Sequence, residues 1–183
     1  METEIAMRMT TKLLGSGIAL LLSAASADAE ASTASAQLKD ADGRDVGTVE
    51  LRETASGAVW LTVTGAGLPP GAHGFHIHET GSCDAASGFK SAGGHLAGEH
   101  QHGVLTRGGA HPGDLPNIHV GSGGNLKFEA FIAAGSSRKS WFQDVGLFDD
   151  DGSAVVIHAD ADDYMSQPSG NAGDRIACGV LKQ

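Results

Sequence analysis

The chain has 183 residues, enough for one domain with a substantial core. Acidic residues outnumber basic ones by 22 to 12 and the formal net charge is −10, so we exclude nucleic acid as a partner, because a phosphate footprint needs clustered Lys and Arg. Glycine is abundant, at 27 residues, and aromatic residues make up only 5% of the chain, which favours a turn-rich β protein over a helical one.

The N-terminal segment, 1–29, has the features of a cleaved secretory signal peptide. Arg8 and Lys12 precede a run of mostly apolar residues, and Ala27 and Ala29 supply small side chains at the cleavage positions. The alternative is a helix that stays part of the folded protein. We expect export and exclude this segment from the fold.

The translation start is open. Glu2 and Glu4 fit poorly in the basic leading part of a signal peptide, so Met7 or Met9 competes with Met1 as the first residue.

The mature part of the chain, 30–183, is predicted to be a single domain. No apolar stretch in it reaches the length that crosses a bilayer, so we expect no transmembrane segment. Two cysteines in an exported protein favour a disulfide, and Cys83 with Cys178 is the one pairing that exists. Two buried free thiols are the alternative.

Short strands separated by turns rich in Gly and Pro open the mature chain. Val49 and Leu51 alternate with polar neighbours, and the same alternation runs through Val59, Leu61 and Val63. Strands at this regular spacing are typical of a β-sandwich or barrel. The strands predicted in this half span 34–39, 46–53, 58–64 and 72–79.

The strand over 72–79 carries His76 and His78, which alternate with Phe75 and Ile77. Side chains two apart on a strand point to the same face with their roots roughly 6–7 Å apart, so the two imidazoles can converge on one ion. The strand therefore predicts an apolar face towards the core and a metal-binding face. Taken alone, two polar side chains on a surface are the competing interpretation.

The alternation stops between 80 and 115, where glycines and histidines crowd together. A structureless stretch of this length inside a compact domain is usually functional. Its candidate residues are Cys83, His95, His100, His102, His111 and Asp114.

The second half resumes the strand pattern and contains a shorter loop at 159–174. Segment 141–148 is ambiguous. The later strands are predicted at 117–120, 126–132, 154–158 and 176–181. Several histidines and an aspartate around one strand predict a first-row transition-metal site, with copper or zinc as the ion, because imidazole suits both and paired cysteines leave no thiolate.

Five sequence blocks carry a resemblance to a known family. They are Gly74-Phe-His-Ile-His-Glu79, Gly93-Gly-His95, His111-Pro-Gly-Asp-Leu-Pro-Asn117, Val155-Val-Ile-His158-Ala-Asp-Ala-Asp-Asp163 and Gly170-Asn-Ala-Gly-Asp-Arg-Ile-Ala-Cys-Gly179. In this order they resemble the copper–zinc superoxide dismutases, in the branch exported by bacteria, over about 34–181. The resemblance implies an all-β fold, an eight-stranded antiparallel Greek-key β-sandwich or barrel with two long functional loops, and a periplasmic, envelope or secreted location.

The resemblance also implies one copper and one zinc per subunit. The implied copper ligands are His76, His78, His95 and His158. The implied zinc ligands are His95, His102, His111 and Asp114, so that His95 bridges the two metals.

One zinc ligand is ambiguous at this stage. The interval from His95 to His102 is shorter than the family's, so His100 competes with His102. The spacing to His111 and the following Gly103 favour His102.

The remaining site residues follow from the same blocks. Asp162 would link a copper histidine to a zinc histidine, which fixes ring orientation. Arg175, next to the acidic Asp174, would attract and orient the anion. The implied reaction converts superoxide to dioxygen and hydrogen peroxide by alternate reduction and oxidation of copper, with His95 carrying a proton to the peroxide.

The net negative charge opposes an anionic substrate, and the loop 159–174 contains no lysine. Whether Lys90, Arg107, Arg138 or Lys139 supplies a steering charge is open.

Other interpretations concern function, assembly and two further histidines. An exported copper- or zinc-binding protein without turnover is the alternative function, although such a protein is expected to lack a ligand or Arg175. Monomer and homodimer are both open, with Phe131 or Trp141 on an exposed face, and so is attachment to the envelope. His73 is predicted to be hydrogen-bonded in the core, and His119 to be exposed.

Overall fold

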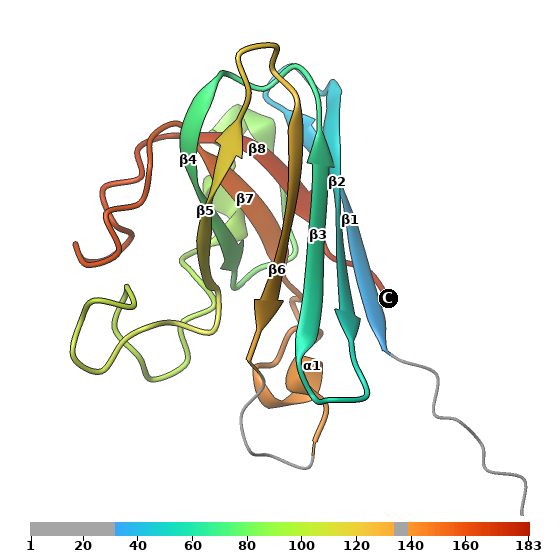
Figure 1. The fold of residues 1–183 in the computed structure, drawn as a ribbon, viewed down its shortest axis with the longest axis vertical. Coiled ribbons are helices and arrows are strands. Elements are labelled where there is room, and N and C mark those ends of the chain that lie inside the picture. Colours follow the sequence, from blue (N-terminus) through green and yellow to red (C-terminus); the bar gives the residue numbers. More distant parts are fainter. Residues whose placement is uncertain (1–31, 134–138) are drawn as a thin grey trace, which may run out of the picture.

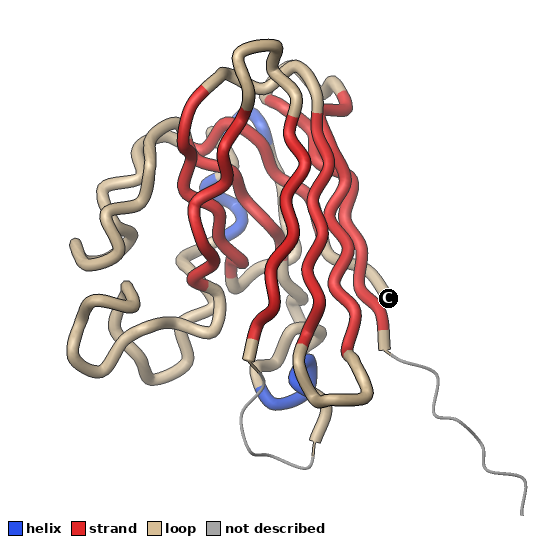
Figure 2. The backbone as a smooth tube through the Cα atoms, in the orientation of Figure 1, coloured by secondary structure: helices blue, strands red, loops and turns tan. Residues whose placement is uncertain are grey.

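The strands expected from the sequence form one antiparallel eight-stranded sheet in the computed structural model, which describes residues 32–133 and 139–183. Strands dominate its regular structure (Figures 1 and 2). They are β1 (Thr33–Asp40), β2 (Asp45–Glu53), β3 (Val59–Gly65), β4 (Gly71–His78), β5 (Asp114–Val120), β6 (Leu126–Ile132), β7 (Ala154–His158) and β8 (Arg175–Val180).

The strand order along the sheet is β5-β4-β7-β8-β1-β2-β3-β6. Its two end strands, β5 and β6, lie next to each other, so the sheet curls into a nearly closed barrel. Strands β4, β5 and β6 are consecutive in the barrel, while β7 returns beside β4 and β3 lies beside β6. This is the Greek-key arrangement, as predicted.

The barrel core contains the apolar side chains that alternate along the strands. Val49, Leu51, Val59, Leu61 and Val63 are all buried, with exposed fractions of 0 or 1%, as the sequence pattern predicted. Burying each such side chain contributes roughly 1.5–3 kcal/mol relative to leaving it in water.

Strand β4 differs from these strands because both of its faces are buried. Phe75 and Ile77 lie in the barrel core, while His76 and His78 have no exposed surface although they point the other way. Loops cover that second face, so the histidines of β4 lie inside the protein rather than on its surface.

The structure settles two points of local structure that the sequence left open. The ambiguous segment 141–148 is no strand: Trp141–Asp144 is a single turn of α-helix, α1, whose Trp141 and Phe142 are buried. Its first turn is held by the carboxylate of Glu53, which accepts from Ser140 Oγ at 2.7 Å and Phe142 N–H at 3.1 Å. Of the two aromatic residues proposed for an exposed face, Phe131 is exposed and Trp141 is not.

Strand β5 begins three residues earlier than predicted, at Asp114. Pro116 obscures this start in the sequence, because proline has no N–H to donate to a neighbouring strand. Within the sheet β5 forms a ladder with β4 alone, so the missing donor is tolerated. The earlier start places Asp114 directly opposite His76.

Two loops, which we call the long loop (79–113) and the short loop (159–174), leave the barrel on the same side, next to β4 and β5 (Figure 1). The long loop contains two short 3₁₀ turns, η1 (Ala85–Ser87) and η2 (Lys90–Ala92). Cys83 in this loop forms a disulfide with Cys178 of β8, across 95 positions of sequence. Closing a loop of that length stabilises the fold by about 4–5 kcal/mol on the chain-entropy account.

The predicted signal peptide, 1–29, lies outside the described residues, as does Arg138. Within the described ranges, no helix is long and apolar enough to cross a membrane.

Candidate metal centre

A first cluster of four histidines forms where β4, β7 and the long loop meet. β4 contributes His76 and His78, β7 ends with His158, and His95 comes from the long loop, where it pairs with His78 in an isolated bridge. One ring nitrogen of each histidine lies within 4.8 Å of the others, and all four residues are buried. We call this group the four-histidine cluster.

Each ring of the four-histidine cluster has one nitrogen left without a partner among the described residues. These buried atoms are His76 Nδ1, His78 Nε2, His95 Nε2 and His158 Nε2. A buried polar atom without a partner is costly, and four that converge on one point are explained by a bound cation. The imidazole donor set suits copper or zinc, so the site fits the metals that the sequence implies.

The second nitrogen of each ring is fixed by the protein. His78 Nδ1 donates to the main-chain oxygen of Gly93 at 3.1 Å, and His158 Nδ1 donates to that of Gly173 at 3.3 Å. His76 Nε2 donates to Asp162 Oδ2 at 2.8 Å. These contacts orient the free nitrogen of each ring towards the common point.

A second cluster adjoins the first and contains a carboxylate. The Nδ1 atoms of His95, His102 and His111 lie 2.9, 3.0 and 3.1 Å from Asp114 Oδ1. Three nitrogens around one carboxylate oxygen have nearly the spacing of tetrahedral zinc ligands, whose bonds of 2.0–2.1 Å set the ligand atoms about 3.3 Å apart. We call this group the His–Asp cluster.

His95 belongs to both clusters. Its Nε2 is one of the unpartnered atoms of the four-histidine cluster, and its Nδ1 faces Asp114. One imidazole ring therefore separates the two candidate metal positions.

Asp162 in the short loop links the two clusters by hydrogen bonds to one histidine of each. Its Oδ2 accepts from His76 Nε2 and its Oδ1 from His102 Nε2 at 3.0 Å. Asn117 of β5 fixes the main chain of Asp162: the side-chain Nδ2 donates to its carbonyl at 2.9 Å, and Oδ1 accepts from its N–H at 2.8 Å. The adjacent Gly170 has a φ of +66°, and a Cβ there would overlap the Asp162 carboxylate.

Burial favours the neutral form of three histidines in the four-histidine cluster. It lowers the pKa of His76 to about 4, of His78 to about 2 and of His158 to about 3. Burial alone would raise the pKa of Asp114, but hydrogen bonds from His95 and the main-chain N–H of Gly103 hold that pKa well below its usual range. Neutral imidazoles and an ionised carboxylate are the forms that bind a metal cation, so the site is ready for metal at neutral pH.

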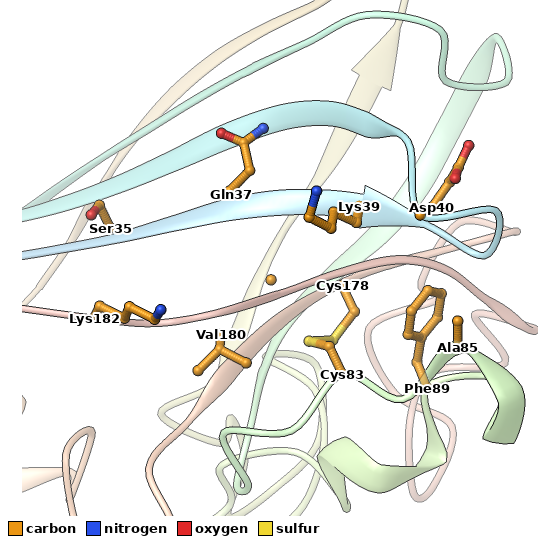
Figure 3. Close-up of a pocket in the computed structure, with 12 residues that line it drawn as sticks. Ser35, Gln37, Lys39, Asp40, Cys83, Ala85, Phe89, Cys178, Val180 and Lys182 are labelled. Atoms are coloured by element: carbon orange, nitrogen blue, oxygen red, sulfur yellow. A yellow bond between two sulfur atoms is a disulfide. The ribbon is translucent and has the colours of Figure 1, made fainter.

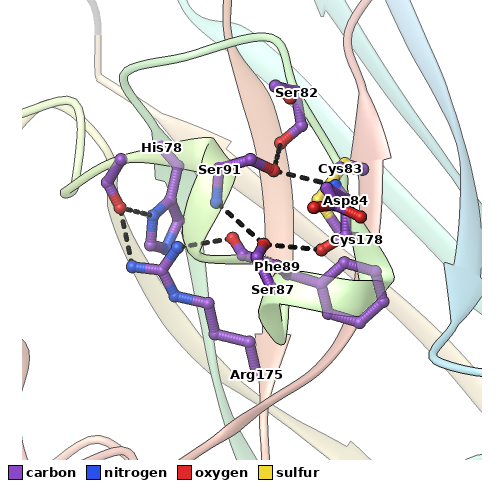
Figure 4. Close-up of a disulfide and its surroundings, with 10 residues drawn as sticks. His78, Ser82, Cys83, Asp84, Ser87, Phe89, Ser91, Arg175 and Cys178 are labelled. Carbon is purple, nitrogen blue, oxygen red and sulfur yellow. Dashed lines mark hydrogen bonds between the residues drawn. A yellow bond between two sulfur atoms is a disulfide. The ribbon is translucent and has the colours of Figure 1, made fainter.

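Arg175 lies beside His78 at the start of β8. Its guanidinium donates to the carbonyl of Phe89 at 2.7 Å and to that of Gly93 at 2.6 Å, the same oxygen that His78 holds (Figure 4). Burial lowers the pKa of Arg175 from its ordinary value. The disulfide to Cys178, three residues along β8, fixes the loop that supplies both carbonyls.

A cavity of about 480 Å³ lies next to the disulfide (Figure 3). It is bounded by β1, β8 and the long loop, with Phe89 and the disulfide on one wall and Lys39 and Lys182 among its polar residues. None of the residues of either cluster lines it.

The structure gives the two competing histidines of the long loop different surroundings. His102 is fully buried in the His–Asp cluster, whereas His100 is exposed and belongs to neither cluster. His73 is buried and its ring bonds the carbonyls of His158 and Pro69, each at 2.8 Å. His119 is exposed.

Sequence reasoning missed the polar groups that support the ligands. Asn117 lies in a block that was identified, but nothing in its spacing assigns it a contact with Asp162. The carbonyls of Phe89 and Gly93 carry no side-chain signal at all, because every residue has a main-chain oxygen.

The comparisons with known proteins agree with this geometry. The family model described as copper/zinc superoxide dismutase matches residues 46–181. Superoxide dismutase [Cu-Zn] 1 of Aquifex aeolicus is 43% identical over 152 residues, which cover 80% of this chain and 86% of that protein. Superoxide dismutase [Cu-Zn] 2 of the same organism is 39% identical over 181 residues, 96% of this chain and all of that protein.

Solved structures with the same fold include two bacterial proteins. A SOD-like protein from Bacillus subtilis superimposes with a TM-score of 0.72 at 39% identity, covering 81% of this chain and 97% of that chain. A Cu/Zn superoxide dismutase from Brucella abortus gives a TM-score of 0.62 at 27% identity, covering 82% of this chain and all of that one.

Replacing His102 by Ala is expected to abolish zinc retention, because the His–Asp cluster loses a buried ligand, whereas His100→Ala is expected to retain zinc. Metal analysis after dialysis against a weak chelator measures both. Zinc retained by His102→Ala and lost by His100→Ala would reverse the ligand assignment.

The metal-free protein is expected to lose stability as the pH falls from about 6.5 towards 4. Below the ordinary histidine pKa of 6.5, the unfolded chain binds protons at His76, His78 and His158 that the folded chain does not. The free energy of unfolding therefore falls by up to about 1.4 kcal/mol per pH unit for each histidine.

Urea denaturation of the metal-free protein between pH 7.5 and 4.5 measures this slope. The variant His119→Gln, which changes an exposed histidine, should show the same slope as the unaltered protein. A stability that stays flat over this range would contradict the prediction.

Proposed function

We propose that the four-histidine cluster is the copper site and the His–Asp cluster the zinc site of a superoxide dismutase, because the chain belongs to the copper/zinc superoxide dismutase family. The substrate is superoxide, the products are dioxygen and hydrogen peroxide, and the cofactors are copper and zinc. Bound copper supplies the alternating one-electron oxidation and reduction that this reaction needs.

The observation that carries the assignment is the position of His95 between the two clusters. Its two ring nitrogens face two different sets of ligands, and an imidazole is the side chain that offers two nitrogens for this purpose. Two superoxide ions and two protons give one dioxygen and one hydrogen peroxide. His95 Nε2 is the atom at which the chain holds one of those protons, while Nδ1 stays fixed beside Asp114; the second proton comes from water.

The three other copper-side histidines hold their rings still during this cycle. Each has its second nitrogen bonded to a main-chain oxygen or to Asp162, so gain or loss of a proton at His95 does not require them to move. A site whose groups are already oriented needs little reorganisation when charge changes within it.

Arg175 is the group that attracts and orients the anion. Its guanidinium is half-buried and tied to two carbonyls, so a positive charge is held beside His78 at the edge of the copper site. A local positive charge of this kind offsets the repulsion that a net charge of −10 exerts on an anionic substrate.

The protein is proposed to act outside the cytoplasm, in the periplasm or the cell envelope. The features that support this are the signal-peptide pattern over 1–29 and the disulfide between Cys83 and Cys178, which persists in oxidising compartments.

Protein loaded with one copper and one zinc per chain is expected to consume superoxide much faster than the same buffer with the metal-free protein. Pulse radiolysis, or stopped-flow decay of superoxide absorbance, measures the rate. The alternative, a metal-binding protein without turnover, is indicated if the metals are stoichiometric and the decay stays at the rate of the buffer.

Replacing Arg175 by Ala is expected to lower the second-order rate by about tenfold or more, because local charge raises anion encounter rates by 10–10³. Copper content should not change, since Arg175 is not a ligand. The matched control is Arg52→Ala, which removes an equal charge from the outer face of β2 and should leave the rate nearly unaltered. Equal rates in both variants would remove the guiding role of Arg175.

A further inference from the structure

The main chain of His102 is held by a side chain from the other loop. Gln167 in the short loop accepts through Oε1 from His102 N–H at 2.9 Å and donates through Nε2 to the His102 carbonyl at 2.8 Å. A carboxamide presents one donor and one acceptor, as a peptide unit does. Gln167 and His102 therefore form two reciprocal hydrogen bonds, like a residue pair on neighbouring β-strands. The two residues are 65 positions apart in sequence.

His102 has no regular structure of its own to fix it. It is fully buried, yet it lies in the irregular part of the long loop, and among the described residues its N–H and C=O have no hydrogen-bond partner besides Gln167. Buried main-chain groups need partners. Gln167 supplies both.

The position of this main chain decides where the ring lies. The ring of His102 spans two carboxylates, with Nδ1 3.0 Å from Asp114 Oδ1 and Nε2 3.0 Å from Asp162 Oδ1. A histidine side chain has two rotatable bonds, so the main chain must be held in place for the ring to meet both oxygens.

The clamp by Gln167 is continuous with a short set of contacts between the two loops. Leu105 N–H donates to the Tyr164 carbonyl at 3.1 Å, and Thr106 Oγ1 donates to that of Met165 at 3.2 Å. Gln167 Nε2 also donates to the Met165 carbonyl at 3.0 Å, which fixes its own side chain. Gly103 allows this close approach, because a Cβ there would overlap the Tyr164 carbonyl.

From these contacts we propose that Gln167 is a positioning residue of the zinc site, which holds His102 in the geometry that retains zinc. The inference rests on the proposed function, since it takes His102 as a zinc ligand. The residue does not touch the metal or the substrate; it acts through the main chain of His102. Asn117 holds the main chain of Asp162 by the same two kinds of hydrogen bond. His102 and its partner Asp162 are therefore each held through the main chain by a side-chain carboxamide.

The experiment compares zinc release from the copper- and zinc-loaded protein. The variants are Gln167→Met, which keeps the side-chain length without the hydrogen bonds, and Gln167→Glu, which places an oxygen against the His102 carbonyl. The matched control is Gln101→Met, the same substitution one residue from His102 at an exposed position whose side chain has no hydrogen bond among the described residues. Release into excess chromogenic chelator at neutral pH gives the rate.

Both Gln167 variants are expected to release zinc about 10–100-fold faster than the unaltered protein, as when other groups that orient a metal ligand are removed. The Gln101→Met protein should release zinc at the unaltered rate. Gln167 is exposed and covers the His102 main chain from the solvent side, so loss of its amide opens those main-chain groups to water. The unfolding temperature of the metal-free variants should therefore change by less than about 3 °C.

Unaltered release rates in both Gln167 variants would overturn the proposal. Faster release together with a clearly lower unfolding temperature of the metal-free variants would also overturn it, because it would assign Gln167 to the stability of the loop. His102→Ala separates this inference from the proposed function. If that variant loses zinc while the Gln167 variants keep it, the inference alone is wrong; if it keeps zinc normally, the zinc site itself is wrong.

Discussion

The candidate metal centre depends on one buried carboxylate, that of Asp162. Its two oxygens accept hydrogen bonds from His76 Nε2 and His102 Nε2, at 2.8 and 3.0 Å, and so connect β4 to the long loop. Each bond assigns the proton of a ring to the nitrogen facing Asp162 and leaves the other nitrogen free for a metal. Without this carboxylate, neither the tautomer nor the angle of the two rings would be fixed.

Such a carboxylate is costly to bury, and the fold offsets the cost with hydrogen bonds. Burial raises the pKa of Asp162, but the hydrogen bonds from His76, the main chain of Tyr164 and His102 outweigh it, and the pKa lies below the ordinary value. The carboxylate therefore stays ionised in the interior. An anion hydrogen-bonded to the far side of the two rings also makes them better electron-pair donors to a cation on the near side.

The sequence predicts the strands of the barrel because the apolar alternation of β2 and β3 continues without interruption. It also predicts that His76 and His78 meet in one cluster, because they lie two apart on a strand, where the pleat points them to one face. It does not predict α1, a single turn held by the Glu53 carboxylate from a strand far away in sequence. It does not predict the start of β5, because Pro116 lacks an N–H and so argues against a strand at that position.

The choice between His100 and His102 shows why spacing alone is insufficient. Both histidines lie in an irregular loop, where no period relates sequence position to direction. What separates them in space is contact with the short loop, through Asp162 and Gln167, and those partners lie 60 and 65 positions further along the chain. Contacts between distant loops leave no periodic pattern in a single sequence.

The two halves of the metal centre are enclosed by different kinds of attachment. Beside the four-histidine cluster, the part of the long loop that carries Phe89 and Gly93 is joined to β8 by the disulfide and by Arg175. Beside the His–Asp cluster, the part of the long loop around His102 is attached to the short loop by hydrogen bonds. Segments held only by hydrogen bonds open at lower free energy than segments that are also cross-linked. Binding of a metal by the His–Asp cluster would therefore contribute most where the chain has no covalent bond of its own, and it would help to close that side of the protein.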